Sequence, residues 1–255
     1  LFNVIEIFIL SLIQGITEFI PVSSSSHLII ISKYLNFDNQ SLSIDVSLHI
    51  GSFIAVLFYF RKEITSFIDD KIILFKILIS SIPVMLVGFF LVETGSIEKI
   101  RNIKIIAFTT IIFGILLYIS DRFKLEKNIN KNFTFKSAFF IGIFQILSLV
   151  PGVSRSGIAI TAARFLNFKR VDAGKISFLI SIPILAAVSI FGIKNLVTSE
   201  DFIFTYTNLM SIIVSFFFSL ITIKYFLKYV NKFNLNIFVY YRIFLGLVLM
   251  ILAYL

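Results

Sequence analysis

The 255-residue sequence has no cysteine, only two histidines and only 14 acidic residues. The absence of cysteine excludes disulfide bonds and thiol chemistry, and it leaves the redox compartment undecided. Zinc sites of the usual kinds are not expected, because their cysteine and histidine ligands are absent or scarce. The sequence also lacks a P-loop and a dinucleotide-binding motif, so the common nucleotide-binding classes are not indicated.

Long apolar runs dominate what is present. Hydrophobic residues make up 58% of the chain, its mean hydropathy is +1.00, and short polar stretches separate the apolar runs. These features indicate an all-α integral membrane protein. Because every polar interruption is short, we expect a single membrane domain over residues 1–255. The net charge of +9 then reflects the charge bias of membrane proteins, and no nucleic-acid partner is expected.

About ten helical segments are predicted, and six of them are candidates to span the bilayer. A crossing needs about 20 residues, so the first candidate is short unless it continues into its polar flanks. The six predicted spans are residues 47–60, 73–92, 104–120, 174–194, 207–230 and 238–255.

Four further segments form two pairs, and proline and serines break each pair in its middle. The second member of each pair is too short to cross, so we expect two re-entrant hairpins, each entering and leaving on one side. The first hairpin comprises 4–20 with 27–35, and the second comprises 137–150 with 157–166.

A hairpin followed by three spans occurs twice, in halves of about 1–125 and 133–255. Three crossings are an odd number, so the second half is expected to be inverted relative to the first. Inverted repeats of this kind bring broken helices together near the membrane midplane. A shift of 130 residues places Pro21 on Pro151, Ser24 on Ser154 and Ser26 on Ser156.

The predicted loops divide the basic residues unequally between the two sides of the membrane. The side of the N-terminus receives five, namely Lys33, Lys99, Arg101, Lys104 and Lys194. The other side receives fifteen, which makes it cytoplasmic, so the first hairpin opens outward and the second opens to the cytoplasm. The fifteen are Arg61, Lys62, Lys71, Arg122, Lys124, Lys127, Lys131, Lys136, Arg164, Lys169, Arg170, Lys175, Lys224, Lys228 and Lys232.

The second break, "PGVSRSG" at 151–157, carries groups that suit an anion. Pro151 ends one helix and Gly152 permits a sharp turn into the next. The free N–H groups of that helix, the Arg155 guanidinium and the hydroxyls of Ser154 and Ser156 predict a phosphate cradle. Ordinary serine capping is the alternative, but a cap needs no arginine inside a membrane.

The first break, within "QGITEFIPVSSSSHL" at 14–28, offers acid–base groups. Gln14 and Glu18 are spaced i, i+4 and therefore share one face of the entering helix. His27 could act as base, acid or nucleophile. Glu18 could orient His27, accept a proton, or hold Mg²⁺ or Ca²⁺ on a phosphate. The two breaks together indicate phosphoryl transfer, with further phosphate contacts from Gln14 and from the hydroxyls of Ser23, Ser25 and Ser26.

Four polar residues outside the breaks are weaker candidates: His49, Gln145, Asp45 and Arg164. His49 lies at the outer end of a predicted span, where a structural role is favoured over a catalytic one. Gln145 is placed to bond the backbone of the second break. Arg164 is expected to be a simple charge on the cytoplasmic side.

The two breaks resemble the two signature motifs of the undecaprenyl-diphosphatase family, the bacitracin-resistance proteins of bacterial membranes. The resemblance covers essentially the whole chain. It implies hydrolysis of undecaprenyl diphosphate to undecaprenyl phosphate and inorganic phosphate, which recycles the lipid carrier for peptidoglycan and other wall polymers. It also implies a multi-pass protein of the bacterial plasma membrane, whose active-site hairpin opens to the periplasmic side.

The resemblance assigns roles by position and implies help from divalent cations. Gln14 and Glu18 match an (E/Q)xxxE pair, Ser24 a serine implicated in catalysis, His27 the essential histidine, and Arg155 the arginine of the second motif. Ser26 departs from the pattern, because the family usually has glycine just before the histidine. If that position has a positive φ, serine is strained there.

Several alternatives stay open at the level of sequence. The nucleophile could be Ser24, His27 or a water molecule. A transporter is the rival function, because inverted repeats with broken helices also occur in alternating-access carriers, and a polyprenyl-phosphate flippase would use the same cradle. The oligomeric state is open too, a homodimer included.

Overall fold

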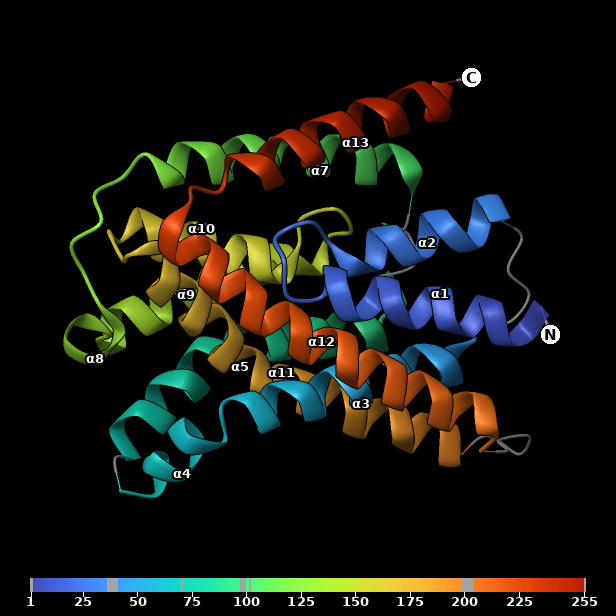
Figure 1. The fold of residues 1–255 in the computed structure, drawn as a ribbon, viewed down its shortest axis with the longest axis horizontal. Helices are drawn as coiled ribbons and strands as arrows, with labels where there is room; N and C mark the ends of the chain where they lie inside the picture. Colours follow the sequence, from blue (N-terminus) through green and yellow to red (C-terminus); the bar gives the residue numbers. More distant parts are fainter. Residues whose placement is uncertain are drawn as a thin grey trace.

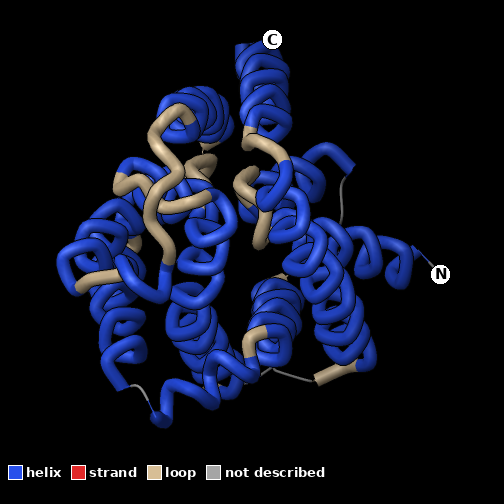
Figure 2. Tube along the Cα trace, turned by 60° about the vertical axis from the view of Figure 1, so that its left-hand side comes forward, coloured by secondary structure: helices blue, strands red, loops and turns tan. Residues whose placement is uncertain are grey.

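A computed structural model describes residues 2–35, 41–69, 71–96, 100, 102–198 and 204–254, without the side chains of 2–3, 32–35 and 66–69. All regular elements within these ranges are helices, and none is a strand (Figure 2). The predicted all-α class is therefore confirmed. Two of the predicted outer-side cations, Lys99 and Arg101, lie outside the described residues, as does the side chain of Lys33.

Six helices are long and apolar enough to cross a membrane, as predicted. The first continues into its polar N-terminal flank and begins five residues before the predicted position, where the Ser41 Oγ accepts a hydrogen bond from the Ile44 N–H at 3.3 Å. The six are α3 (Leu42–Tyr59), α5 (Lys71–Glu93), α7 (Ile103–Asp121), α11 (Arg170–Val197), α12 (Tyr206–Lys232) and α13 (Asn236–Tyr254).

The two predicted hairpins are formed by shorter helices. The first consists of α1 (Phe2–Thr17) and α2 (Ser24–Leu35). The second consists of α9 (Phe135–Ile146), a 3₁₀ turn η1 (Leu147–Leu149) and α10 (Arg155–Phe165). Figure 1 shows the two turns beside each other in the middle of the bundle. Two short connecting helices were not predicted, because their sequences are polar: α4 (Arg61–Asp69) and α8 (Ile129–Asn132).

Helix pairing follows the pattern that an inverted repeat predicts. The α1 helix packs against α12, and its counterpart α9 packs against α5, the counterpart of α12. The counterparts α3 and α11 contact each other, and so do α7 and α13. Figure 1 shows α1 starting at the right end of the bundle and α9 starting at the left end, so the two hairpins run in opposite directions. The exact limits of the two halves stay a prediction.

The predicted alignment of the two breaks is wrong by one residue. Ser23 and Ser154 both have left-handed backbones, with φ of 78° and 73°, and each directly precedes a hairpin helix. Ser154 therefore corresponds to Ser23, with a shift of 131 residues, and Arg155 corresponds to Ser24. The alignment on the two prolines failed because Gly152 gives the second turn one more residue between its proline and the helix.

The basic loops gather at one end of the bundle, as predicted. The end of α3, the starts of α5 and α11, and the short helices α4 and α8 all lie at the left end in Figure 1. Arg164 is an exception, because it is fully buried instead of being a loop charge. Its guanidinium forms an ion pair with Asp121 at 3.4 Å and donates to the Lys124 carbonyl at 3.0 Å. The expectation that Arg164 is a simple charge on the cytoplasmic side is therefore wrong, because its side chain is buried.

Close contact between α3 and α12 depends on small residues. The Ser215 Oγ donates to the Leu48 carbonyl at 2.8 Å, and the Ser219 Oγ donates to the Ser52 Oγ at 3.0 Å. Hydrogen bonds between small residues are a common way to join membrane helices. Gly51 lets the backbones approach, because a Cβ there would lie 2.4 Å from the Ile212 carbonyl oxygen.

We therefore expect Gly51→Ala to destabilise the protein by about 1–3 kcal/mol, because the added methyl forces α3 and α12 apart. Thermal unfolding in detergent measures this change. Ile54→Ala is the matched control on the same helix, because Ile54 is 42% exposed on the outer surface. Equal melting temperatures for the two variants would contradict the packing argument.

Candidate active site

The tips of the two hairpins meet through direct side-chain contacts. Glu18 lies just after the end of α1, and Arg155 is the first residue of α10. The Arg155 Nη2 donates to the Glu18 Oε1 at 2.7 Å, across 137 positions of sequence. The Ser156 Oγ donates to the Ile20 carbonyl at 2.8 Å. The predicted convergence of the two breaks therefore agrees with the structure.

Glu18 is the centre of this contact and is only 7% exposed. Its Oε2 accepts a hydrogen bond from the Ser24 Oγ at 2.6 Å and another from the Gln14 Nε2 at 3.1 Å. The i, i+4 spacing of Gln14 and Glu18 thus places both on one face, as expected. The Gln14 Nε2 also lies 3.2 Å from the His49 Nδ1, which brings His49 next to the site.

Serine hydroxyls surround both helix starts. The Ser23 Oγ lies 2.9 Å from the Ser26 Oγ and 3.5 Å from the Ser25 Oγ. The Ser154 Oγ accepts from the Gly157 N–H at 3.1 Å and lies 3.2 Å from the Ser156 Oγ. The N-termini of α2 and α10 thus face the same region, since Ser24 and Arg155 both contact Glu18, and the positive end of each helix dipole favours an anion.

Backbone strain falls on a different serine from the one that the sequence indicated. Ser26 lies in the first turn of α2 and has no positive φ, so the condition under which serine would be strained there is not met. Ser23 and Ser154 carry it instead, in a region that side chains other than glycine rarely adopt. Strain of this kind persists only where surrounding contacts impose it, and it clusters at functional sites.

His27 is held by groups other than Glu18. Its Nδ1 lies 2.6 Å from the Ser23 carbonyl oxygen, and its Nε2 lies 2.5 Å from the Tyr241 hydroxyl. A carbonyl only accepts, so Nδ1 carries the proton, and a neutral His27 accepts from Tyr241 at Nε2. The two rings stack with centroids 5.7 Å apart. One of the roles considered for Glu18 is to orient His27. That prediction is wrong, because Tyr241 and the Ser23 carbonyl orient His27 instead.

Sequence reasoning missed two adjacent residues of α13. Tyr241 holds His27, and Arg242 lies fully buried beneath the two tips. The Arg242 guanidinium donates to carbonyl oxygens of both hairpins and of α7. One signal was available: an arginine inside a segment apolar enough to span a membrane is costly unless it has partners. The Arg242 bonds run to the carbonyls of Thr110 (3.2 Å), Pro21 (3.2 Å), Val153 (3.0 Å) and Gly152 (2.8 Å).

Gln145 occupies the position in α9 that Gln14 has in α1. Its Nε2 donates to the Ser80 carbonyl on α5 at 2.8 Å, so the expected bond to the second break is not formed. Both glutamines are fully buried, and the Oε1 of each has no hydrogen-bond partner within the described chain. Gln145 therefore has a packing role on α5, whereas Gln14 contacts the acid of the site.

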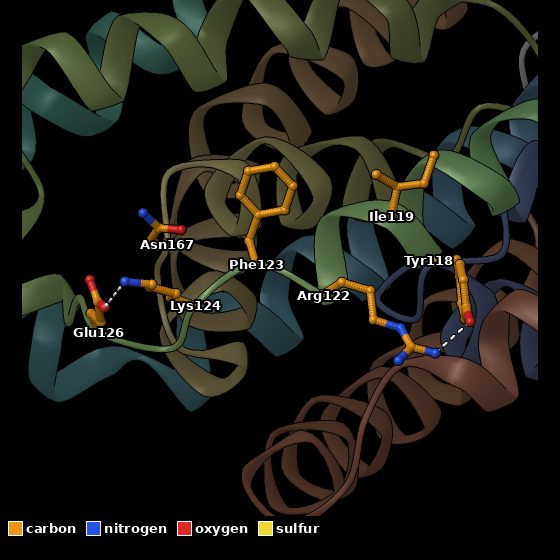
Figure 3. Close-up of a pocket in the computed structure, with 7 residues that line it drawn as sticks. All are labelled: Tyr118, Ile119, Arg122, Phe123, Lys124, Glu126 and Asn167. Atoms are coloured by element: carbon orange, nitrogen blue, oxygen red, sulfur yellow. Dashed lines mark hydrogen bonds and ion pairs between the residues drawn. The ribbon is translucent and has the colours of Figure 1, made fainter.

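A cavity of about 600 Å³ lies elsewhere, beside the loop after α7 (Figure 3). None of the predicted site residues lines it. Lys124 and Glu126 form an ion pair at 3.5 Å at its edge. The cavity therefore belongs to the basic end of the bundle and not to the hairpin tips. Its lining residues are Tyr118, Ile119, Arg122, Phe123, Lys124, Glu126 and Asn167.

The fold and the site together define a class: a multi-pass helical membrane protein in which two helical hairpins meet at a buried cluster of charged and hydroxyl side chains. Comparison with known proteins makes the class specific. The family model described as "Bacitracin resistance protein BacA" matches residues 7–248, and the chain belongs to this family.

Three curated relatives match this chain over nearly their whole length. An undecaprenyl-diphosphatase of Pelagibacter ubique is 49% identical over 99% of this chain and 98% of its own. Undecaprenyl-diphosphatase 1 of Pseudoalteromonas translucida is 35% identical, over 98% of each chain. An undecaprenyl-diphosphatase of a Jannaschia species is 33% identical, over 99% of each chain. The resemblance seen in the two breaks is therefore confirmed over the whole sequence.

The left-handed backbone at Ser154 gives a stability prediction. Ser154→Ala and Ser154→Gly both remove the hydroxyl that caps α10, but only glycine relaxes the strained φ. We expect the alanine variant to be less stable than the glycine variant by about 1 kcal/mol. Thermal unfolding of both variants in the same detergent measures the difference. An alanine variant as stable as the glycine variant would contradict the strained backbone.

Proposed function

We propose that the protein hydrolyses undecaprenyl diphosphate to undecaprenyl phosphate and inorganic phosphate. The observation that carries the proposal is the meeting of Arg155, Glu18 and Ser24 at the two hairpin tips. Family membership and the names of the relatives support the same activity. The reaction would return the lipid carrier to peptidoglycan synthesis and would confer bacitracin resistance.

Substrate binding would exchange the partner of Arg155. The guanidinium is paired with Glu18, and a diphosphate at the helix starts would compete for its planar donors. Transfer of Arg155 to the phosphate oxygens leaves the Glu18 carboxylate free to act as a base. The isoprenoid tail would run between the helices into the lipid. Arg155 and the N–H groups at the starts of α2 and α10 would then stabilise the charge on the transferred phosphoryl group.

The geometry favours Ser24 as the nucleophile. Its Oγ donates to the Glu18 Oε2 at 2.6 Å, which is the contact needed for proton transfer to a base. The Ser24 oxygen would attack the terminal phosphorus, its proton would pass to Glu18, and the bond to the bridging oxygen would break. Undecaprenyl phosphate leaves, and water then hydrolyses the phosphoserine. His27 is less suitable, because both ring nitrogens already have partners.

A divalent cation, Mg²⁺ or Ca²⁺, is compatible with these donors. The Glu18 carboxylate and the Ser24 hydroxyl supply oxygen ligands, which hard cations prefer, and the substrate phosphates and water would supply the others. Among the described residues no group of three or more histidine, aspartate or glutamate side chains could hold such an ion alone. The cation would therefore be held jointly with the substrate, and it would neutralise phosphate charge.

The charge distribution supports a proposal for the location of the site. We infer the bacterial inner membrane, with the basic end of the bundle in the cytoplasm and the first hairpin opening to the periplasmic side. The lipid substrate would enter from the membrane itself. A homodimer stays a prediction.

Phosphate release by purified protein in detergent tests the proposed function. We expect Arg155→Gln to lower the rate about 10²–10³-fold, because the site loses a donor that stabilises the transferring phosphoryl group. Arg122→Gln is the matched control, since Arg122 is an exposed arginine at the basic end. Full activity in Arg155→Gln would contradict the anion site. A wild-type protein that releases no phosphate would favour the flippase, because detergent removes the second compartment.

The nucleophile is tested with substrate labelled in the terminal phosphate. We expect acid quenching during turnover to trap label on Ser24, and Ser24→Ala to abolish both the trapped label and phosphate release. Ser96→Ala, a serine beyond the end of α5, serves as the control. Undiminished turnover in Ser24→Ala would instead assign the attack to a water activated by Glu18.

A further inference from the structure

Arg242 of α13 is bonded to both hairpin tips at once. Its Nη1 donates to the carbonyls of Pro21 and Val153, at 3.2 and 3.0 Å, and its Nη2 donates to the carbonyl of Gly152 at 2.8 Å. We propose that Arg242 is a positioning residue, which fixes the distance between the two tips and thereby places Arg155 against Glu18 and Ser24. Its catalytic consequence rests on the proposed function.

Two of the carbonyls that Arg242 binds, those of Pro21 and Gly152, hold matching places in the two hairpins. With the shift of 131 residues, Pro21 corresponds to Gly152, and each lies two residues before the strained serine that directly precedes a hairpin helix. One guanidinium thus joins the same backbone position of both repeats. The planar guanidinium suits this arrangement, because donors on two of its nitrogens bond both tips at the same time.

These bonds also supply hydrogen-bond partners for buried backbone carbonyls. Pro21, Gly152 and Val153 are buried, so their carbonyls have no access to water. A buried carbonyl without a partner is costly, and here the partners come from one side chain. Within the described chain, no carboxylate forms an ion pair with Arg242. Its positive charge is therefore held by carbonyl dipoles and adds to the field that favours an anion at the tips.

Neighbouring residues of α13 and α7 help to fix the Arg242 side chain. Tyr241, the preceding residue, bonds His27 in the first hairpin. Gly114 of α7 faces Arg242 directly: a Cβ added at Gly114 would lie 3.2 Å from the Arg242 Cβ and 3.7 Å from its Nε. The Arg242 Nε is itself held by the Thr110 carbonyl on α7 at 3.2 Å. The Nε of Arg242 is thus fixed against α7, while its Nη1 and Nη2 donate to the two hairpin tips.

Arg242→Lys tests the proposal, with Arg164→Lys as the matched control. Both arginines are fully buried and donate to backbone carbonyls, but Arg164 lies at the far end of α10, away from the tips. Lysine keeps the charge and loses the planar fork. We expect Arg242→Lys to lower kcat about 10²-fold, because small misplacement of reacting groups has effects of that size. We expect Arg164→Lys to alter the melting temperature but to stay within threefold of the wild-type kcat.

A thiol reporter separates positioning from simple loss of charge or stability. The chain has no cysteine, so Val153→Cys introduces a single thiol at a fully buried position of the second tip. We expect maleimide labelling to be slow in the Val153→Cys background and at least tenfold faster when Arg242→Lys is added. Addition of Arg164→Lys should leave the labelling rate unchanged. A labelling rate that does not respond to Arg242→Lys in folded protein would overturn the proposal.

Gly114→Ala provides a second route if Arg242→Lys does not fold. The new methyl would press on Arg242 while touching neither hairpin, so it should shift the guanidinium and give a smaller change in both kcat and labelling, in the same direction. Unchanged values for both would also overturn the proposal. The two proposals are refuted by different results. A wild-type protein without phosphate release would refute the proposed function, whereas the labelling rate tests whether Arg242 positions the two tips, regardless of activity.

Discussion

The absence of water inside a bilayer is the constraint on which the rest of this structure depends. Each hairpin breaks its helix in the middle of the bundle, and each break frees backbone groups that must find partners within the protein. Side chains from elsewhere supply them: Ser156 for the carbonyl of Ile20, Thr109 for that of Pro151 and Arg242 for three more. Every one of these bonds joins segments distant in sequence, so satisfying the breaks also assembles the bundle.

The contacts that satisfy the breaks also create the chemistry. A helix that begins inside the bundle presents free N–H groups, and two such starts, at Ser24 and Arg155, face one region. Glu18 and Arg155 neutralise each other there, which lowers the cost of burying either charge alone. In the proposed mechanism, an arriving diphosphate would replace the carboxylate as the partner of Arg155. A stable buried ion pair is thus also a site that an anion can enter by exchange.

Much of this was accessible from the sequence, for identifiable reasons. Hydropathy predicted all six spans, and proline with serines predicted both hairpins, because these signals are local. The one-residue error in aligning the breaks came from Gly152, whose effect on the turn cannot be seen without the backbone. Arg242 and Tyr241 were missed because their partners lie about 90 to 220 positions away. Arg164 was misjudged for the same reason: a basic residue near a loop is usually solvated, and its buried partners are set by tertiary packing.

The inverted repeat explains why the two tips differ in side chains but not in backbone. Under the 131-residue shift, Gln14 matches Gln145 and Ser23 matches Ser154, and these pairs share burial or backbone conformation. The chemical groups do not match: Glu18 corresponds to Leu149, His27 to Ile158 and Ser24 to Arg155. Two identical tips would place two carboxylates or two guanidinium groups against each other, and like charges at that distance repel strongly in a buried site. A symmetric backbone can therefore bind and hydrolyse a phosphate only if one half carries the acid–base groups and the other half carries the cation.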